Sequence, residues 1–453
     1  MRSCAFLLLL LSCNALWSQD KHLLYNQRHN PQALMLNPGM AYQKTDFHIG
    51  IPLLSNIYVS LGNTDFSMDA IFNANDINAN IEEVLDRMSS EDFLAFNQKL
   101  DLLHIGWRRG KRYYSAGAYQ EIDAVSNFPK DLIELAYYGN AGQNRSYDLG
   151  HINTKVNTQT VFHFGINQQM NENLHLGARV KLYTSSLNAR SLRNTGRFRS
   201  RTDETGLLLT QTISNLNLKF DSTGIENADE LTPGNLLFGS NLGLGFDFGL
   251  SYIIDDKLEF TASLLDLGFI QFSKDTQRLT VQGYYEYEGL EIQFPDFAQG
   301  GDLVTYYQDL GDDIEEALPS ETTSDAYTFV QPAKMNLGLS YRFGSVSGSY
   351  DCTLTPARER FGNQTLSLHV FSMANAGNLF YSINAMYERR FWNAFYVKAS
   401  LGVDQFNRPN YGGGLALDAG KVNLFLNLDR LNNVTNLYEA KALAFQFGMN
   451  LKF

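Results

Sequence analysis

The chain ends with FQFGMNLKF, residues Phe445 to Phe453, in which every second residue is large and apolar. The apolar positions are Phe445, Phe447, Met449, Leu451 and Phe453, and the residues between them are Gln446, Gly448, Asn450 and Lys452. Side chains alternate between the two faces of a β-strand, so this stretch predicts a strand with one apolar and one polar face. Such a strand suits either the edge of a soluble β-sandwich or the wall of a membrane β-barrel, which is apolar toward lipid and polar toward its lumen.

Similar alternation recurs along the chain and predicts about fourteen strands, many of them close to the roughly 9–11 residues that suit a tilted bilayer crossing. The expected hairpins join 100–107 to 112–120, 160–167 to 174–188, 241–254 to 258–272, and 335–343 to 346–352. Further strands are expected at 378–387, 394–403, 411–417, 422–428 and 443–453. An even strand count is usual for single-chain barrels of bacterial outer membranes.

The overall composition narrows the class of protein. The chain has 453 residues and a net charge of −12, and it has no basic stripe, which argues against a nucleic-acid partner. Its 31 Phe and 24 Tyr favour strands. After Asp20 no run of about 18 apolar residues occurs, so a transmembrane helix is not expected.

The first nineteen residues, MRSCAFLLLLLSCNALWSQ, have the form of a secretory signal peptide. Arg2 precedes an apolar core, and small residues follow, so cleavage is expected after Ala15 or near Ser18. Leu10-Leu11-Ser12-Cys13 also resembles a lipobox, which leaves lipidation of Cys13 open. Beyond these residues only Cys352 remains, so no intrachain disulfide is expected.

Export, aromatic content and strand number together favour an all-β fold, namely a transmembrane antiparallel β-barrel of about fourteen strands in the outer membrane of a Gram-negative bacterium. The last strand should pair with the first, because a closed barrel leaves no unpaired edge in lipid. The alternating apolar residues that end on Phe453 also resemble the assembly signal read by the outer-membrane insertion machinery. Membrane lipid and that machinery are therefore the expected partners.

Three stretches interrupt the strand pattern of the barrel, which is expected over residues 45–453. Residues 20–44 are too irregular for a strand and too apolar for a free tail, so they are predicted to plug the lumen, with Asn37-Pro38-Gly39 turning the chain from lumen to wall. Residues 75–99 have helical periodicity and predict a helical insert. Residues 289–330 predict an acidic insert with a short helix-like piece around Asp309 to Glu316.

Motifs of enzymes and cofactor sites are incomplete. Gly243-x-Gly245-x-x-x-Gly249 has its third glycine one place late for a dinucleotide loop, and the chain continues as a strand. Neither a Gly-x-Ser-x-Gly elbow nor a His-Glu-x-x-His zinc motif is present. We therefore expect no catalysis, cofactor or metal, and we expect His104, His163 and His175 to face the lumen.

Several short stretches resemble a little-characterised family of Bacteroidota outer-membrane barrels, similar to the long-chain fatty-acid transporter barrels and to PorV, the barrel component of type IX secretion. They are Asn37-Pro38-Gly39, Gly177-Ala178-Arg179-Val180-Lys181, Gly243 to Tyr252, Leu265 to Ile270, and Phe447 to Phe453. The resemblance implies a barrel with an N-terminal segment folded into the lumen, and no reaction.

Two functions follow from this resemblance as hypotheses. One is passage or binding of small hydrophobic molecules, and the other is a non-enzymatic scaffold or accessory barrel in protein secretion or surface assembly. An apolar lumen beside the plug would favour the first, and a filled lumen with large protruding loops would favour the second. The fold alone does not decide between them.

Overall fold

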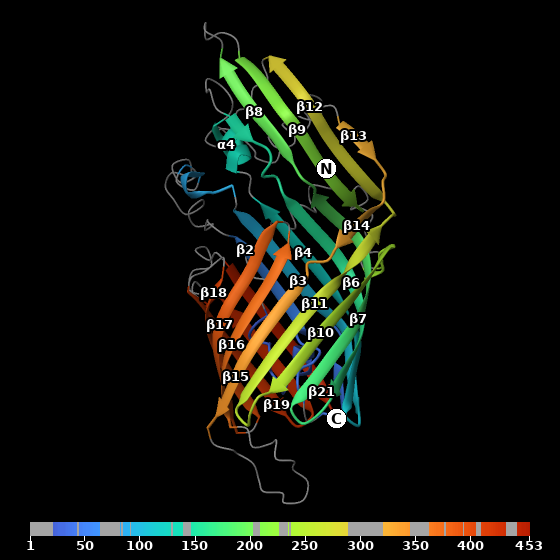
Figure 1. Ribbon diagram of the computed structural model, residues 1–453, viewed down its shortest axis with the longest axis vertical. Coiled ribbons are helices and arrows are strands. Elements are labelled where there is room, and N and C mark those ends of the chain that lie inside the picture. Colours follow the sequence, from blue (N-terminus) through green and yellow to red (C-terminus); the bar gives the residue numbers. More distant parts are fainter. Residues whose placement is uncertain are drawn as a thin grey trace, which may run out of the picture.

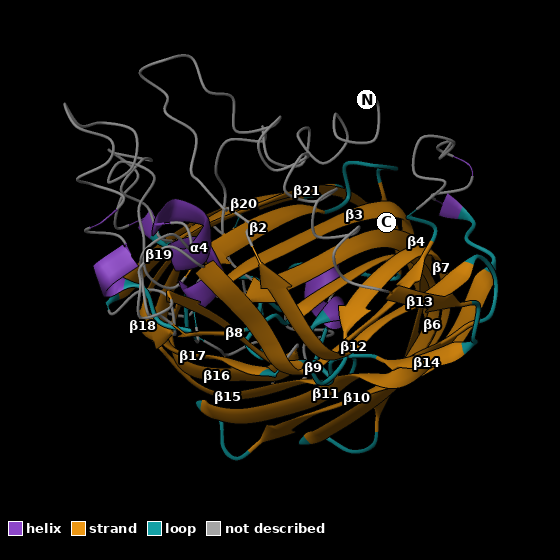
Figure 2. Ribbon diagram, turned by 90° about the horizontal axis from the view of Figure 1, so that it is seen from above, coloured by secondary structure: helices purple, strands orange, loops and turns teal. Residues whose placement is uncertain are grey.

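The computed structural model describes residues 21–42, 45–63, 85–90, 92–127, 130–138, 146–202, 209–225, 237–288, 320–344, 362–375, 377–392, 394–404, 409–431 and 442–453, together with residues 82 and 234. These residues form one continuous antiparallel sheet that closes on itself as a barrel (Figures 1 and 2). Within the described part of the chain the barrel has 14 strand positions, which confirms the expected fold class and strand number.

The strands follow one another around the barrel largely in chain order. They are β1 (Phe47–Gly50) with β2 (Ile57–Asn63), β3 (Phe93–Arg109), β4 (Arg112–Asn127), β6 (Thr154–Gln169), β7 (Leu174–Ser191), β10 (Asn241–Ile253), β11 (Leu258–Phe272), β14 (Tyr327–Val330) with β15 (Lys334–Phe343), β16 (Gln364–Asn375), β17 (Asn378–Phe391), β18 (Phe395–Asp404), β19 (Asn410–Ala419), β20 (Val422–Asp429) and β21 (Ala442–Lys452). β1 and β2 share one position because both pair with β3 and β21. β14 and β15 likewise share one, since both pair with β11.

The last strand closes the barrel against the first. β21 pairs with β20 on one side and with β1 and β2 on the other, and the backbone N–H of Phe453 donates to the carbonyl of Phe47 (2.7 Å). Gln446, Gly448 and Asn450 are buried toward the lumen, while the odd-numbered residues between Phe445 and Phe453 are partly or fully exposed on the outer face. This is the predicted alternation; a role of those apolar residues as an assembly signal stays a prediction.

The two ends of the barrel differ in the length of their connections. One end has short turns, such as residues 110–111, 170–173 and 420–421, together with the longer connection between β15 and β16; the other end has most of the long connections. In the short turn 254–257, the N–H groups of Lys257 and Leu258 donate to Asp255 Oδ1 (2.7 and 2.8 Å) and hold the pKa of this carboxyl below its usual range. Short turns are typical of the periplasmic side, so the end with most of the long connections faces outward from the cell.

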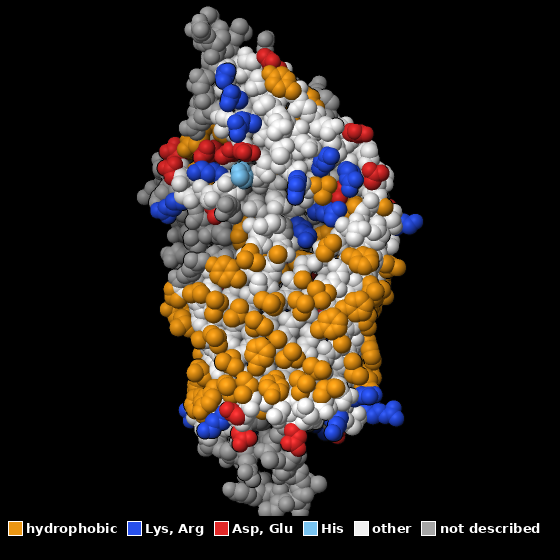
Figure 3. Space-filling view, in the orientation of Figure 1, with side chains coloured by type: hydrophobic (Ala, Val, Ile, Leu, Met, Phe, Trp, Pro, Cys, Tyr) orange, Lys and Arg blue, Asp and Glu red, His pale blue; other side chains and the backbone are white. Residues whose placement is uncertain are grey.

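A continuous apolar band covers the face of the lower barrel that is seen in Figure 3, and charged side chains lie at its rim. Exposed apolar side chains at outward positions form it, among them Phe246, Phe248 and Leu264. Such a band flanked by charges is the lipid-facing surface of an outer-membrane barrel. None of the helices in the described part of the chain has the length and apolarity required to cross a bilayer.

Several strands continue beyond the membrane band on one side and form what we call the extracellular subdomain (Figure 1). It comprises α4 (Lys130–Tyr138), β5 (Ser146–Asp148), β8 (Thr195–Thr202), β9 (Leu209–Thr223), β12 (Thr276–Glu288) and β13 (Ser320–Thr323). The upper end of β7 pairs with β9, which also pairs with β8 and β12. The subdomain has its own small core, formed by Leu135, Tyr147, Leu149, Phe198, Ile213, Leu216 and Val281.

Residues 21–42, which we call the lumen segment, lie inside the barrel as turns and one short 3-10 helix, η1 (Pro31–Met35). The helix starts where the side chain of Asn30 accepts a hydrogen bond from the N–H of Gln32 (3.0 Å), and Pro31 occupies a first-turn position that needs no donor. Most side chains of the segment are buried, and the others are partly buried. Its contacts with lumen-facing residues of β6, β7, β10, β11, β18, β20 and β21 place it across the bore.

Two predicted inserts and one hairpin need correction. Residues 93–99, expected in a helix, begin β3, because Phe93-Leu94-Ala95-Phe96 also fits a strand period and pairs with both β2 and β4. The predicted acidic insert cannot extend to residue 330, since β13 and β14 occupy most of 320–330; its acidic residues 309–316 lie outside the described residues. The neighbour of β15 is β16; the expected strand 346–352 is also outside them.

Candidate functional site

The Asn37-Pro38-Gly39 turn fastens the lumen segment to the wall. Asn37 Oδ1 accepts from the N–H of Gly39 (2.9 Å), and Asn37 Nδ2 donates to the carbonyl of Leu250 on β10 (3.0 Å). On β6, Asn167 Nδ2 donates to the carbonyls of Pro38 (2.7 Å) and Met40 (2.8 Å). The wall itself begins only at Phe47, so this turn docks the segment on the barrel, and its role in directing the chain from the lumen into the wall stays a prediction.

Two wall glycines allow this close approach. Gly177 on β7 and Gly249 on β10 are direct cross-strand partners. A Cβ added to Gly177 would lie 2.0 Å from the Pro38 carbonyl oxygen, and one added to Gly249 would lie 2.1 Å from Asn37 Oδ1. Since real side chains do not approach so closely, both positions need glycine for the turn to dock.

Gly177→Ala should destabilise the barrel by roughly 1–3 kcal/mol, the usual cost of overpacking, because the added methyl group meets backbone rather than a flexible side chain. The measurement is the temperature at which the compact form is lost on unboiled gels. Gly413→Ala is the matched control, since its Cβ would lie 3.6 Å from Leu431, an ordinary contact. Equal melting of both variants would argue that the turn is not held at this place.

Ionic groups also hold the lumen segment. Glu259 on β11 pairs with Arg28 of the segment and with Arg342 on β15, and all three side chains are largely buried. Arg179 on β7 donates to the carbonyls of Leu34 (2.6 Å) and Met35 (3.3 Å) and pairs with Asp247 (3.0 Å). A buried charge that loses its partner is strongly destabilising, so these pairs fix the segment in one position.

An irregularity in the wall directs one carboxylate into the lumen. The register between β10 and β11 shifts at Asp247, and Asp266 has a φ of 61°, a left-handed conformation. The N–H of Asp266 donates to Asp247 Oδ1 (2.8 Å), which stabilises this bulge. On the other side of β11, the strand position shared by β14 and β15 is interrupted between them. There the N–H of Gln331 donates to the carbonyl of Gly268 on β11 (3.0 Å).

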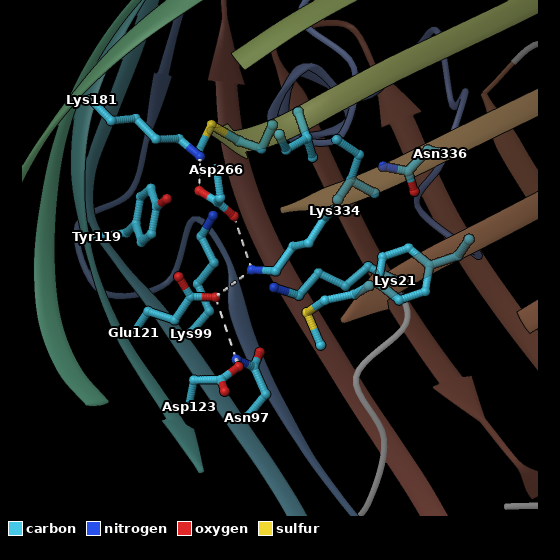
Figure 4. Close-up of a pocket in the computed structure, with 15 residues that line it drawn as sticks. Lys21, Asn97, Lys99, Tyr119, Glu121, Asp123, Lys181, Asp266, Lys334 and Asn336 are labelled. Carbon is cyan, nitrogen blue, oxygen red and sulfur yellow. Dashed lines mark hydrogen bonds and ion pairs between the residues drawn. The ribbon is translucent and has the colours of Figure 1, made fainter. Parts of the chain in front are cut away.

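Above the lumen segment, a cavity of about 50 Å³ is lined by charged side chains (Figure 4). Lys334 Nζ lies 3.0 Å from Asp266 and 3.4 Å from Glu121, and Lys181 Nζ lies 2.5 Å from Asp266 and 2.9 Å from Asp247. Asn97 Nδ2 donates to Glu121 (3.3 Å) and Asp123 (3.2 Å). These residues come from strands far apart in the sequence that face one another across the bore.

Two further lysines line this cavity without a carboxylate partner among the described residues. Lys99 Nζ lies 3.5 Å from the ring centroid of Tyr119, and Lys21 Nζ lies 4.2 Å from that of Tyr58. A cation over an aromatic face is stabilised, but its N–H groups still lack acceptors. Lys21 and Lys99 therefore leave donors available to an anion in the cavity (Figure 4).

The remaining wall of the cavity is apolar and consists of Met35, Leu36, Leu265, Phe371 and Met373. Phe371 and Met373 belong to a larger buried cluster that also contains Phe93, Phe380 and Leu443. The cavity thus places ammonium groups beside an apolar surface, an arrangement that matches a molecule with an acidic head and an apolar body.

Sequence reasoning did not identify these lumen residues. A usable signal was present: Lys99, Glu121, Asp123 and Lys181 are charged residues within strands that cross a membrane, where charges face the interior and mark functional positions. The lumen-facing histidines were predicted: His104, His163 and His175 are all buried on the inner face. Among the described residues, no group of three or more His, Cys, Asp or Glu side chains is arranged to hold a metal ion.

Comparison with known proteins places the chain in a family. Residues 38–429 match the model of a family of unknown function, DUF5723. The chain belongs to the DUF5723 family. A search among curated proteins finds no matching sequence. Bacteroidota origin and similarity to PorV stay predictions.

Solved structures resemble this DUF5723 protein over nearly its whole length, with low sequence identity. The toluene transporter TbuX of Ralstonia pickettii has 11% identity and a TM-score of 0.42, with 93% of this chain and 92% of that chain covered. The toluene transporter TodX of Pseudomonas putida has 10% identity, a TM-score of 0.42 and the same coverage. A FadL homologue of Pseudomonas aeruginosa has 10% identity and a TM-score of 0.41, covering 93% and 94%. Likeness at this level says nothing about a shared ligand.

Proposed function

We propose that this DUF5723 protein binds small hydrophobic molecules that carry an acidic group and passes them across the outer membrane. The observation that supports this is the cavity in which Lys21 and Lys99, without carboxylate partners among the described residues, lie beside the apolar wall of Met35, Phe371 and Met373. An ammonium group recognises a carboxylate or phosphate, and the apolar wall accepts the body of the molecule.

The size of the cavity makes movement of the lumen segment part of the proposal. A volume of about 50 Å³ is comparable with that of one or two waters, each taking roughly 30 Å³ in the liquid. It accommodates a head group and no more. Passage therefore requires the lumen segment to shift, and its contacts through Arg28 and Arg179 are among those that must break.

A second candidate is an accessory barrel in secretion or surface assembly. The lumen is filled by residues 21–42 and by charged side chains, and the extracellular subdomain stands above the membrane band. A filled lumen with large protruding parts is the arrangement expected of such an accessory barrel. Co-purification of a protein partner in mild detergent, lost when the subdomain is altered and kept when Lys99 is altered, would favour it.

Lys99→Met tests the proposal while keeping most of the apolar bulk of the side chain. We expect a fluorescent C18 polyene fatty acid to bind the full-length protein in detergent and to bind the variant roughly 10- to 100-fold more weakly, the effect of losing a charged hydrogen bond of about 1.5–3 kcal/mol. Lys257→Met, in the exposed turn between β10 and β11, is the control. Equal affinity of both variants would contradict the proposal.

A further inference from the structure

A row of arginines lies on the outer face of β8 in the extracellular subdomain. Arg197, Arg199 and Arg201 alternate with Phe198 and Ser200, which are buried, so the three guanidinium groups share the opposite face. Alternate residues of a strand are about 6.6 Å apart. Arg193, also exposed, precedes the strand and extends the row toward the barrel.

These arginines are unpaired within the described part of the chain, although the protein as a whole is acidic. Arg190 at the upper end of β7 and Arg278 on β12 both pair with the buried carboxylate of Asp221 (2.8 and 2.7 Å). The four arginines of the row form no such pair with the described residues. Asp148, the cross-strand partner of Arg197, instead accepts a hydrogen bond from the N–H of Gly150 (2.7 Å).

The direction of the row limits what can occupy it. β8 rises from the barrel end of the subdomain toward its tip, and the basic side chains form a line over it on the face seen in Figure 3. The row therefore stands away from the membrane rather than along it. A linear polymer that rises from the cell surface would run parallel to it, whereas a lipid head group would meet its lower end alone.

We infer that the outer face of β8 binds an anionic polysaccharide of the cell surface, with successive guanidinium groups contacting its carboxylates or phosphates. Arginine suits this task because its planar fork donates two parallel hydrogen bonds to one carboxylate or phosphate. Because the row carries only positive charges, its complementary ligand is a polyanion. The regular spacing of the arginines suits a polymer with a regular repeat. The inference is independent of the function proposed for the lumen.

The test compares two variants of the full-length protein in detergent on immobilised polygalacturonate, with neutral dextran as the blank. One carries Arg197→Gln, Arg199→Gln and Arg201→Gln. The control carries Lys111→Gln, Lys257→Gln and Lys421→Gln, which remove the same charge from exposed residues in periplasmic turns. We expect the first to bind roughly tenfold more weakly than the native protein, as the loss of three exposed charge contacts implies, and the control to bind normally.

A parallel arm replaces polygalacturonate with rough lipopolysaccharide, whose core sugars carry phosphates. Retention on polygalacturonate that depends on the three arginines supports the inference. Retention on rough lipopolysaccharide alone would overturn it, because that molecule presents a membrane head group with a short core and no polymer. Three further outcomes would overturn it: no retention of the native protein above dextran, equal losses in the two variants, or equal binding to polyglutamate, which would indicate general attraction to polyanions.

Discussion

A barrel that lacks residues 21–36 is expected to insert normally and to conduct ions at least roughly tenfold better than the full chain in planar bilayers, because a barrel of this size leaves a lumen that something must fill. The deleted residues include η1 and Arg28, and they contact strands on several sides of the bore. The Asn37-Pro38-Gly39 turn remains, so the wall beside Gly177 and Gly249 keeps its inner contact.

The deletion has a clear control and a clear contrary result. The compact form on unboiled gels shows whether the barrel has folded, and Gly413→Ala reports the conductance of a wall variant that leaves the segment in place. A folded deletion variant with unchanged conductance would mean that the seal lies elsewhere, in residues 75–92 or in the extracellular connections.

Removing residues 442–453 should abolish the folded barrel. β21 pairs with β20 and with both β1 and β2, so its loss exposes two strand edges to lipid, where each unpaired backbone group costs several kcal/mol. The expected result is the absence of the compact form on unboiled gels, with the protein recovered as aggregate or degraded. Normal assembly of this variant would contradict the closure described above.

Phe453→Ala separates closure from recognition by the insertion machinery. The backbone of Phe453 still pairs with Phe47, so the closed barrel keeps its hydrogen bonds, and the variant loses the ring that packs 6.0 Å from that of Phe47. Slower insertion with unaltered stability of the inserted protein would support an assembly signal. Insertion at the rate of the native protein would indicate that Phe453 contributes only packing against Phe47.

The hairpins of the barrel were predictable because local alternation and turn chemistry agree. The strands expected at 241–254 and 258–272 match β10 and β11 almost to the residue, and the turn is closed by Asp255 as its sequence suggests. The strands of the extracellular subdomain were not predicted. β9 and β12 pair although β10 and β11 lie between them in the sequence, and β5 pairs with β8 across β6 and β7. These strands also lack the strict apolar face that lipid imposes on the barrel.

The charged cavity could not be located from the sequence for two physical reasons. Lys99, Lys181 and Lys334 come together only because three distant strands face one another across the bore. In addition, the bulge at Asp266 reverses which residues of β11 point inward: Ser263 and Leu265 are buried before it, and Asp266 and Ile270 after it. A simple period of two, continued through this point, assigns the upper half of β11 to the wrong face.

The unbroken length of β7 has a mechanical consequence. This strand runs over 18 residues from the periplasmic turn into the extracellular subdomain, paired with β6 and β10 below and with β9 above. A force on the subdomain acts along the strand, whereas the hydrogen bonds between strands lie across it. The force is therefore distributed over all hydrogen bonds of the ladder, which would have to break together rather than one after another. Gly177, Arg179 and Lys181 lie on this strand below a one-residue bulge at Ser186, and tension at the cell surface therefore reaches the contacts of the lumen segment along one continuous strand.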